Sequence, residues 1–184
     1  MIFKTLLAAF MIIIWDQPSP ADCPIVYDGI DLKSKLYRKE IAPAYWFSYT
    51  PSVLKNELKT QHLIETEAQL SQLESDKYLN LNIQVYSKKA VDEYGLIEPQ
   101  AQLVLTTITN KKIKLLSRSK SQAVFSTDLN KYIYPVSYTL DKGAIKKLAN
   151  DEIDKVGIQW SSGYEEYIVY EVDFLMNQIA CLNQ

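Results

Sequence analysis

The sequence predicts a mainly β protein, either an antiparallel β-sandwich or a partly open barrel of seven to nine short strands. Two or three short helices accompany the strands, one of them at the C-terminus. Three observations carry this prediction: apolar and polar residues alternate with period two in several segments, turn residues separate those segments, and few helices stand between successive strands. A parallel α/β fold would need such helices. The 13 tyrosines suit half-buried pleated surfaces.

The first third of the chain combines an irregular start with strands and one short helix. Residues 23–35 read as an irregular lead-in. Residues 36–49 are strand-like, and Pro43 within them marks an edge strand or a bulge. Ser52 is placed to cap a short helix over 53–59, in which Val53, Leu54 and Leu58 share one face.

The middle of the chain contains the clearest strand. Residues 77–86 alternate apolar and polar side chains without a break, as half-buried strands do. Residues 62–73 lack a clean period, and we interpret them as a strand because the clear strand comes soon after them in the chain. A helical turn that ends at Gly95 is predicted over 90–94. A hairpin around Asn110-Lys111 is predicted from the segments 101–109 and 112–118. Two further strands are predicted over 123–126 and 132–140, the last peripheral or bulged at Pro135.

The last third begins with a helix over 141–149, which Asp141 can cap. Residues 155–160 and 164–172 then alternate on either side of a short loop and predict a hairpin. A final helix follows Asp173. Its apolar face is Leu175, Ile179 and Leu182.

The first 21 residues have the pattern of a secretory signal peptide. Lys4 precedes an apolar run over 5–15, and the small-residue sequence Ser19-Pro20-Ala21 follows it. The run is far shorter than the ~20 apolar residues that span a bilayer, so no transmembrane helix is expected. We place cleavage after Ala21, which leaves residues 22–184 as a single globular domain exported to the periplasm or the extracellular space of a bacterial envelope.

The two cysteines stand near the two ends of the mature chain. An oxidising compartment permits disulfides, and two cysteines allow one intramolecular pair, so we expect a bond between Cys23 and Cys181. Two unrelated buried thiols are the alternative. A lipid anchor on Cys23 is a further one, although Asp22 stands where a lipidated cysteine usually follows a small residue.

The chain lacks the residues, or the spacing between them, that known arrangements of catalytic residues require. The chain has one histidine, His62, and five glycines that stand singly, so it offers neither a base for a serine nucleophile nor a phosphate-binding loop. Zinc sites need several His or Cys ligands, and the acidic groups near Asp28 and Asp151 do not match the calcium-loop pattern. A net charge of −2 gives no reason to expect nucleic acid. No cofactor or metal is expected.

The candidate binding residues lie in the predicted C-terminal hairpin. Tyrosines are common anchors at binding surfaces, and two carboxylates beside rings that could stack on sugars are also the residue types that glycoside hydrolysis uses. Adjacent strand residues point to opposite faces, so the two glutamates cannot act as that pair by themselves. The candidate residues are Tyr164, Tyr167, Tyr170, Glu165 and Glu166.

A basic cluster in the predicted central hairpin is the densest run of charge. Its members are Lys111, Lys112, Lys114, Arg118 and Lys120. Lysines on a sheet edge block unwanted strand pairing, and we interpret the cluster in this way. The alternative is an anionic partner such as lipopolysaccharide or a polyanionic glycan.

The sequence therefore predicts an exported, non-enzymatic accessory domain of the cell envelope that binds another envelope or secreted protein. It would serve as an envelope assembly component or as a periplasmic antagonist of the immunity-protein type. The alternative is a small carboxylate-dependent carbohydrate hydrolase or a sugar-binding module. A cleft with facing carboxylates and aromatic rings would favour this alternative, whereas a flat tyrosine-rich face would favour protein binding.

The predicted processing can be tested directly. N-terminal sequencing of protein purified from the native host should begin at Asp22, because Ser19 and Ala21 occupy the positions that signal peptidase reads. Exported protein that still begins at Met1 would contradict this prediction.

Overall fold

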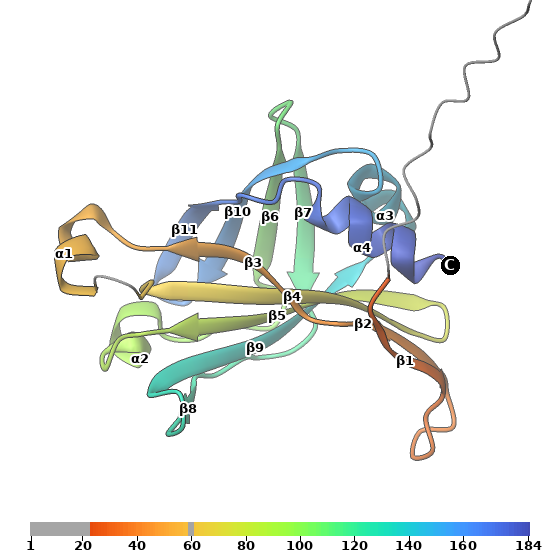
Figure 1. Ribbon diagram of the computed structural model, residues 1–184, viewed down its shortest axis with the longest axis horizontal. Helices are drawn as coiled ribbons and strands as arrows, with labels where there is room; N and C mark the ends of the chain where they lie inside the picture. Colours follow the sequence, from red (N-terminus) through yellow and green to blue (C-terminus); the bar gives the residue numbers. More distant parts are fainter. Residues whose placement is uncertain (1–22, 59–60) are drawn as a thin grey trace, which may run out of the picture.

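The computed structural model describes residues 23–58 and 61–184 (Figure 1). The proposed signal peptide, residues 1–21, lies outside the described residues. The mainly β prediction is confirmed, because eleven strands form one antiparallel open sheet with a few short helices, including one at the C-terminus. The strands number more than the seven to nine expected from the sequence.

The strands are β1 (Ile25–Ile30), β2 (Tyr37–Ile41), β3 (Ala44–Tyr49), β4 (Ile64–Leu73), β5 (Asp76–Val85), β6 (Gln102–Thr107), β7 (Lys112–Ser117), β8 (Val124–Ser126), β9 (Lys131–Leu140), β10 (Ile153–Trp160) and β11 (Gly163–Ile168). The helices are the 3-10 turn η1 (Ser52–Leu54), α1 (Lys55–Leu58), α2 (Ala90–Tyr94), α3 (Lys142–Leu148) and α4 (Phe174–Leu182). Short connections join most of these elements. Turn residues in those connections separate the strand patterns in the sequence.

The sheet follows the order β1-β2-β4-β5-β9-β7-β6-β10-β11, with β3 beside β4 and β8 beside β9. Strands β2 and β3 pair with opposite ends of β4, since the chain turns between them at Ala42 and Pro43. The sheet curves until β3 lies near β11 (Figure 1). Among the described residues no strand pairing joins these two strands, so the sheet stays open there.

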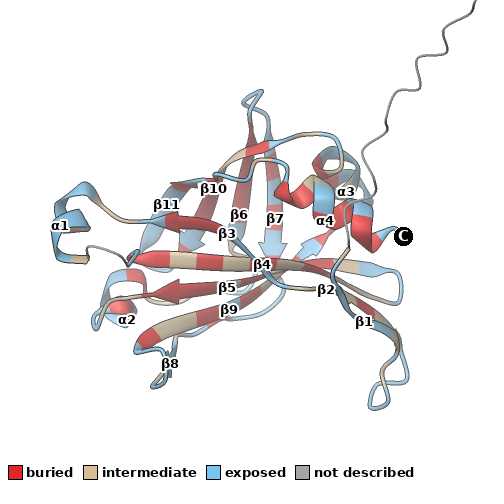
Figure 2. Ribbon diagram, in the orientation of Figure 1, coloured by how far each residue is buried: buried red, intermediate tan, exposed pale blue. Residues whose placement is uncertain are grey.

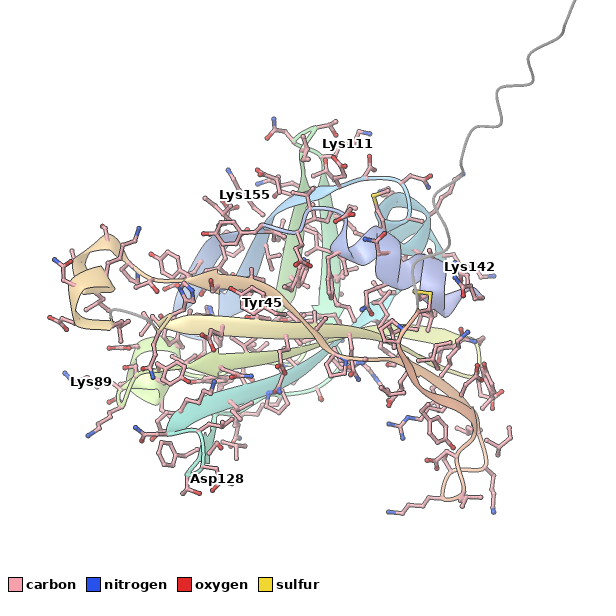
Figure 3. The ribbon with its side chains drawn as sticks, in the orientation of Figure 1. Tyr45, Lys89, Lys111, Asp128, Lys142 and Lys155 are labelled. Atoms are coloured by element: carbon pink, nitrogen blue, oxygen red, sulfur yellow. A yellow bond between two sulfur atoms is a disulfide. The ribbon has the colours of Figure 1, made fainter. Side chains whose placement is uncertain are left out.

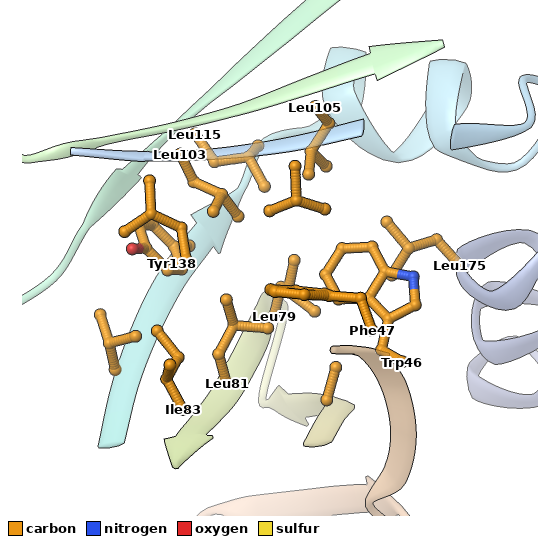
Figure 4. Packing of buried hydrophobic residues seen from close by; sticks show 14 of the residues in the cluster. Trp46, Phe47, Leu79, Leu81, Ile83, Leu103, Leu105, Leu115, Tyr138 and Leu175 are labelled. Carbon is orange, nitrogen blue, oxygen red and sulfur yellow. The ribbon is translucent and has the colours of Figure 1, made fainter. Parts of the chain in front are cut away.

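Aliphatic side chains and several aromatic rings fill the concave side of the curved sheet (Figure 4). Trp160 lies between Tyr94 and Tyr134, with ring centroids 5.1 and 5.2 Å away. Trp46 stacks on Phe174 of α4 at 5.5 Å, which joins the last helix to this core. Period-two alternation places Tyr134 and Trp160 inside, whereas Tyr94 and Phe174 come from the helices α2 and α4. The pattern of buried and exposed residues is visible along the strands (Figure 2).

Helix α4 is fastened to the sheet by polar and covalent bonds as well as by packing. The Gln178 side-chain oxygen accepts a hydrogen bond from the Leu70 backbone N–H at 3.1 Å. The predicted disulfide between Cys23 and Cys181 is confirmed, with the two Cα atoms 5.3 Å apart (Figure 3). It therefore joins the start of the domain to its last helix.

Three local predictions were wrong for reasons of tertiary structure. Residues 25–30 form β1 rather than part of an irregular lead-in, because they pair with β2. Pro135 lies in β9, which is a central strand rather than a peripheral one. At Pro135 the strand pairs only with β5, because the pairing with β8 ends before it and the pairing with β7 begins after it, so the missing N–H of proline costs no hydrogen bond there. Val53 is 80% exposed rather than on a buried helix face, and Pro51 rather than Ser52 takes the N-cap position.

The part of the chain that the structure describes contains no helix long and apolar enough to cross a membrane. The disulfide indicates an oxidising environment.

Removing the disulfide should lower the free energy of unfolding. The paired change Cys23→Ser and Cys181→Ser releases a constraint between residues 158 positions apart, and loss of such a native bond costs about 2–5 kcal/mol. Urea unfolding followed by tryptophan fluorescence would measure the difference. Reduced wild-type protein is the matched control and should resemble the double variant; equal stability of the oxidised protein and the double variant would contradict the prediction.

Candidate functional site

Strand β11 presents its candidate residues on two faces. Tyr167 points into the core, where its ring stacks on Phe47 of β3 at 5.4 Å and its hydroxyl accepts a hydrogen bond from Trp160 Nε1 at 3.2 Å. The same hydroxyl donates to Glu165 at 2.8 Å. Burial, followed by the nearby Glu165, raises the pKa of Tyr167. Tyr167 is therefore a core residue that orients Glu165, not an exposed anchor.

Tyr164 and Glu166 lie on the outer face of β11. The Tyr164 ring lies across Gly157 of the neighbouring strand, so closely that a Cβ at residue 157 would stand 1.9 Å from the Tyr164 oxygen. Its hydroxyl donates to Glu166 Oε1 at 3.0 Å. Burial and this hydrogen bond raise the pKa of Tyr164 to about 12. Glu165 and Glu166 therefore point to opposite faces of β11, as strand geometry predicted.

A hollow of about 460 Å³ lies where β3 and β11 approach each other. We call it the seam pocket, and Tyr49, Glu166, Ile168 and Tyr170 are among its walls. Ile168 is 60% exposed and Tyr170 is 71% exposed, so both present apolar surface to solvent. His62 stands at the edge of this pocket, where its Nδ1 lies 3.2 Å from Thr50 Oγ1. The seam pocket therefore brings together Glu166 and Tyr170 but neither Glu165 nor Tyr167.

A second hollow, of about 470 Å³, lies beside Tyr94 and contains Glu165. Glu57 and Glu93 also line it, and the Ser87 hydroxyl donates to Glu93 at 2.9 Å. Burial, with Glu165 and Glu93 nearby, raises the pKa of Tyr94. The described residues include no group of His, Cys, Asp or Glu that could hold a metal ion.

A third hollow of similar volume has three aromatic walls, Tyr86, Phe125 and Tyr132. The Phe125 and Tyr132 ring centroids are 5.1 Å apart. Lys131 Nζ lies 4.5 Å from the centre of the Tyr86 ring and 3.5 Å from Glu65. Its place could not be predicted from the sequence, because the aromatic walls come from β8, β9 and the residue just after β5. Tyr86 and Tyr132, each at or next to a strand end, were the available signal.

Strand β7 pairs with β6 along most of its length but with β9 only at Leu116 and Ser117, so among the described residues it has one unpaired side beside Lys112 and Lys114. The interpretation of these lysines as protection of a sheet edge stays a prediction. Helix α3 packs against β7 and adds three more lysines. Figure 3 labels Lys111, in the turn before β7, and Lys142, the first residue of α3. Residues 111–147 carry nine Lys and Arg against two Asp, a net charge of +7, whereas residues 151–173 carry −6. Charge is therefore segregated between β7–α3 and β10–β11.

Comparisons with models of protein families, with curated proteins and with solved structures found no match.

The contact between Tyr164 and Gly157 yields a test. Gly157→Ala should displace the Tyr164 ring, break its bond to Glu166 and lower the pKa of Tyr164 from about 12 towards the ordinary value of 10.0. Tyrosinate would then form at lower pH, which ring-labelled NMR titration measures. We expect a loss of about 1 kcal/mol of stability from the overpacking.

The control is Gly157→Ala in a Tyr164→Ala background, where no ring remains to be displaced. The substitution should then cost markedly less, as a double-mutant cycle reports. An unchanged Tyr164 titration in the single variant would contradict the described packing.

Proposed function

We propose that this protein is an exported, non-enzymatic domain that binds another envelope or secreted protein, as an assembly component or as a periplasmic antagonist of the immunity type. The observation that supports this proposal is the pair of facing edges, β3 and β11, with exposed aromatic and apolar side chains beside them. The disulfide and the predicted signal peptide support the exported location.

Sheet edges are binding surfaces because half of their backbone N–H and C=O groups point away from the sheet. Strand β3 pairs with β4, and β11 pairs with β10, while no pairing between β3 and β11 is present in the described part of the chain. An extended segment of a partner can add to such an edge through main-chain hydrogen bonds, with pockets for alternate side chains. Tyr49, Ile168 and Tyr170 provide apolar walls for those side chains.

The local charge further restricts the partner. Residues 151–173 have a net charge of −6, while the seam pocket itself is lined by one acidic residue, Glu166, and one basic residue, Lys55. Complementary charge accelerates association and fixes register. A partner segment that is extended and basic, with apolar residues at alternate positions, fits this surface best.

Site-specific photocrosslinking tests the proposal. A photoreactive phenylalanine analogue at Ile168 or at Tyr170 should give a discrete crosslinked species with one protein in envelopes of the native host. The matched control is the same analogue at Leu116, which is 43% exposed on a different strand. Discrete adducts at Leu116 alone, or at no position, would contradict binding at the seam.

Carbohydrate hydrolysis is the second candidate, because three glutamates and two tyrosines surround the pocket beside Tyr94. Two carboxylates on either side of a sugar can perform this reaction without a metal. If this function holds, purified protein should cleave chromogenic glycosides, and Glu165→Gln and Glu93→Gln should each abolish the cleavage. Cleavage retained in both variants would exclude this pocket as the active site.

A further inference from the structure

A polar groove crosses the outer face of the sheet, away from the seam. Two adjoining hollows form it, with volumes of about 440 and 240 Å³, and both are lined by Gln69 of β4 and Asn80 of β5. Arg38 of β2 and Arg118, just after β7, line the larger hollow. The groove thus collects side chains from strands that are distant in sequence.

Strand register explains why polar groups gather here. Gln69 pairs with Asn80, and Asn80 pairs with Ser137 of β9, so the three side chains form a row across the outer face. The row ends at Arg118, whose backbone N–H donates to the Ser137 carbonyl oxygen at 2.8 Å. Amide, hydroxyl and guanidinium groups therefore lie in one line over four neighbouring strands.

Some of these groups are fixed by each other, and others remain available to a ligand. Asn80 Nδ2 donates to Ser71 Oγ at 2.8 Å, and Asn80 Oδ1 accepts from the Ser137 hydroxyl. The half-buried side-chain amides of Gln69 and Asn82 make no hydrogen bond to any described residue. Each amide offers two donors and an acceptor, so a fixed network lies beside unused hydrogen-bonding groups that face the groove.

The two arginines of the groove differ in their charge environment. Arg38 is neutralised by Glu40 and by Asp31, the latter 3.7 Å away. Arg118 lies over the Tyr78 ring, 4.4 Å from its centre, and has no carboxylate within salt-bridge distance among the described residues. Stacking holds the guanidinium plane, and its remaining donors match the two oxygens of a carboxylate.

We infer that this groove binds an acidic saccharide, with sugar hydroxyls on the amide row and a sugar carboxylate on Arg118. Sugar hydroxyls both donate and accept hydrogen bonds, as the amides and serines of the groove require. The larger hollow has few apolar walls to hold the side chains of a peptide. Tyr78 is 8% exposed beneath Arg118, so it offers no open ring for the base stacking on which single-stranded nucleic acid depends.

This site is independent of the seam between β3 and β11. The groove lies on the outer face of β4, β5 and β9, whereas the seam pocket lies between β3 and β11. The groove would thus hold the protein to an acidic glycan while its seam stays accessible.

Calorimetric titration with defined tetrasaccharides of galacturonate, mannuronate, guluronate and glucuronate tests the inference on the oxidised mature protein. At least one should bind at millimolar concentration or below, and its methyl ester should not. Arg118→Gln should weaken binding by about tenfold or more, since each tenfold corresponds to about one charge-assisted hydrogen bond. Gln69→Ala should weaken binding by a smaller factor.

Lys114→Gln is the matched control, because it removes one positive charge from the outer face of the same β7 region at a residue that does not line the groove. It should change the affinity by less than twofold. Absence of binding by all four acids would overturn the inference. Equal weakening by Arg118→Gln and Lys114→Gln would overturn it too, because it would show general charge attraction. Thermal unfolding of each variant verifies that the fold is retained.

Discussion

The stack between Phe47 and Tyr167 is the contact on which the arrangement of this protein depends. It draws the edge strands β3 and β11 together through side chains, with ring centroids 5.4 Å apart, while no pairing of the described strands joins their backbones. The interior is thereby covered by aromatic rings, and the edges retain their outward N–H and C=O groups. The same Tyr167 fixes Glu165 through its hydroxyl. One contact between side chains thus covers the core while the backbones of the two edge strands stay unpaired with each other.

The disulfide and α4 act at the opposite end of the curved sheet. Cys23 lies just before β1 and Cys181 lies on α4, so the bond joins residues 158 positions apart. The Gln178 side chain of α4 also accepts a hydrogen bond from the Leu70 N–H, and the Phe174 ring of the same helix stacks on Trp46. The edge strand β1, whose neighbour in the sheet is β2, therefore starts from an anchored residue. An oxidising compartment is a condition for this anchoring.

The segregation of charge gives the two proposed surfaces opposite characters. The groove ends at Arg118 and Ser137, in the stretch of the chain that carries +7, although Asp31, Glu40 and Glu67 also line it. The seam is bordered by β11, in the stretch that carries −6. A net charge of −2 conceals this division, because the two regions nearly cancel. An acidic glycan on one surface and a basic protein segment on the other would not compete. Such a division suits a protein that holds a partner at an envelope polymer.

The sequence by itself determined the features that local chemistry controls. Unbroken alternation identified β5, the Asp141 side chain caps α3 by accepting from the Ala144 N–H as expected, and two cysteines with no other partner identified the disulfide. Strand β1, the central place of Pro135 and all the pockets were decided by the tertiary structure. Pairing with the nearby strand β2 gave 25–30 its partner, and the long-range pairing of β5 with β9 brought Gln69 and Asn80 into one row with Ser137 and Arg118. A period-two pattern tells which face a side chain takes but not which strand lies beside it, because the neighbour is chosen by the curvature and packing of the whole sheet.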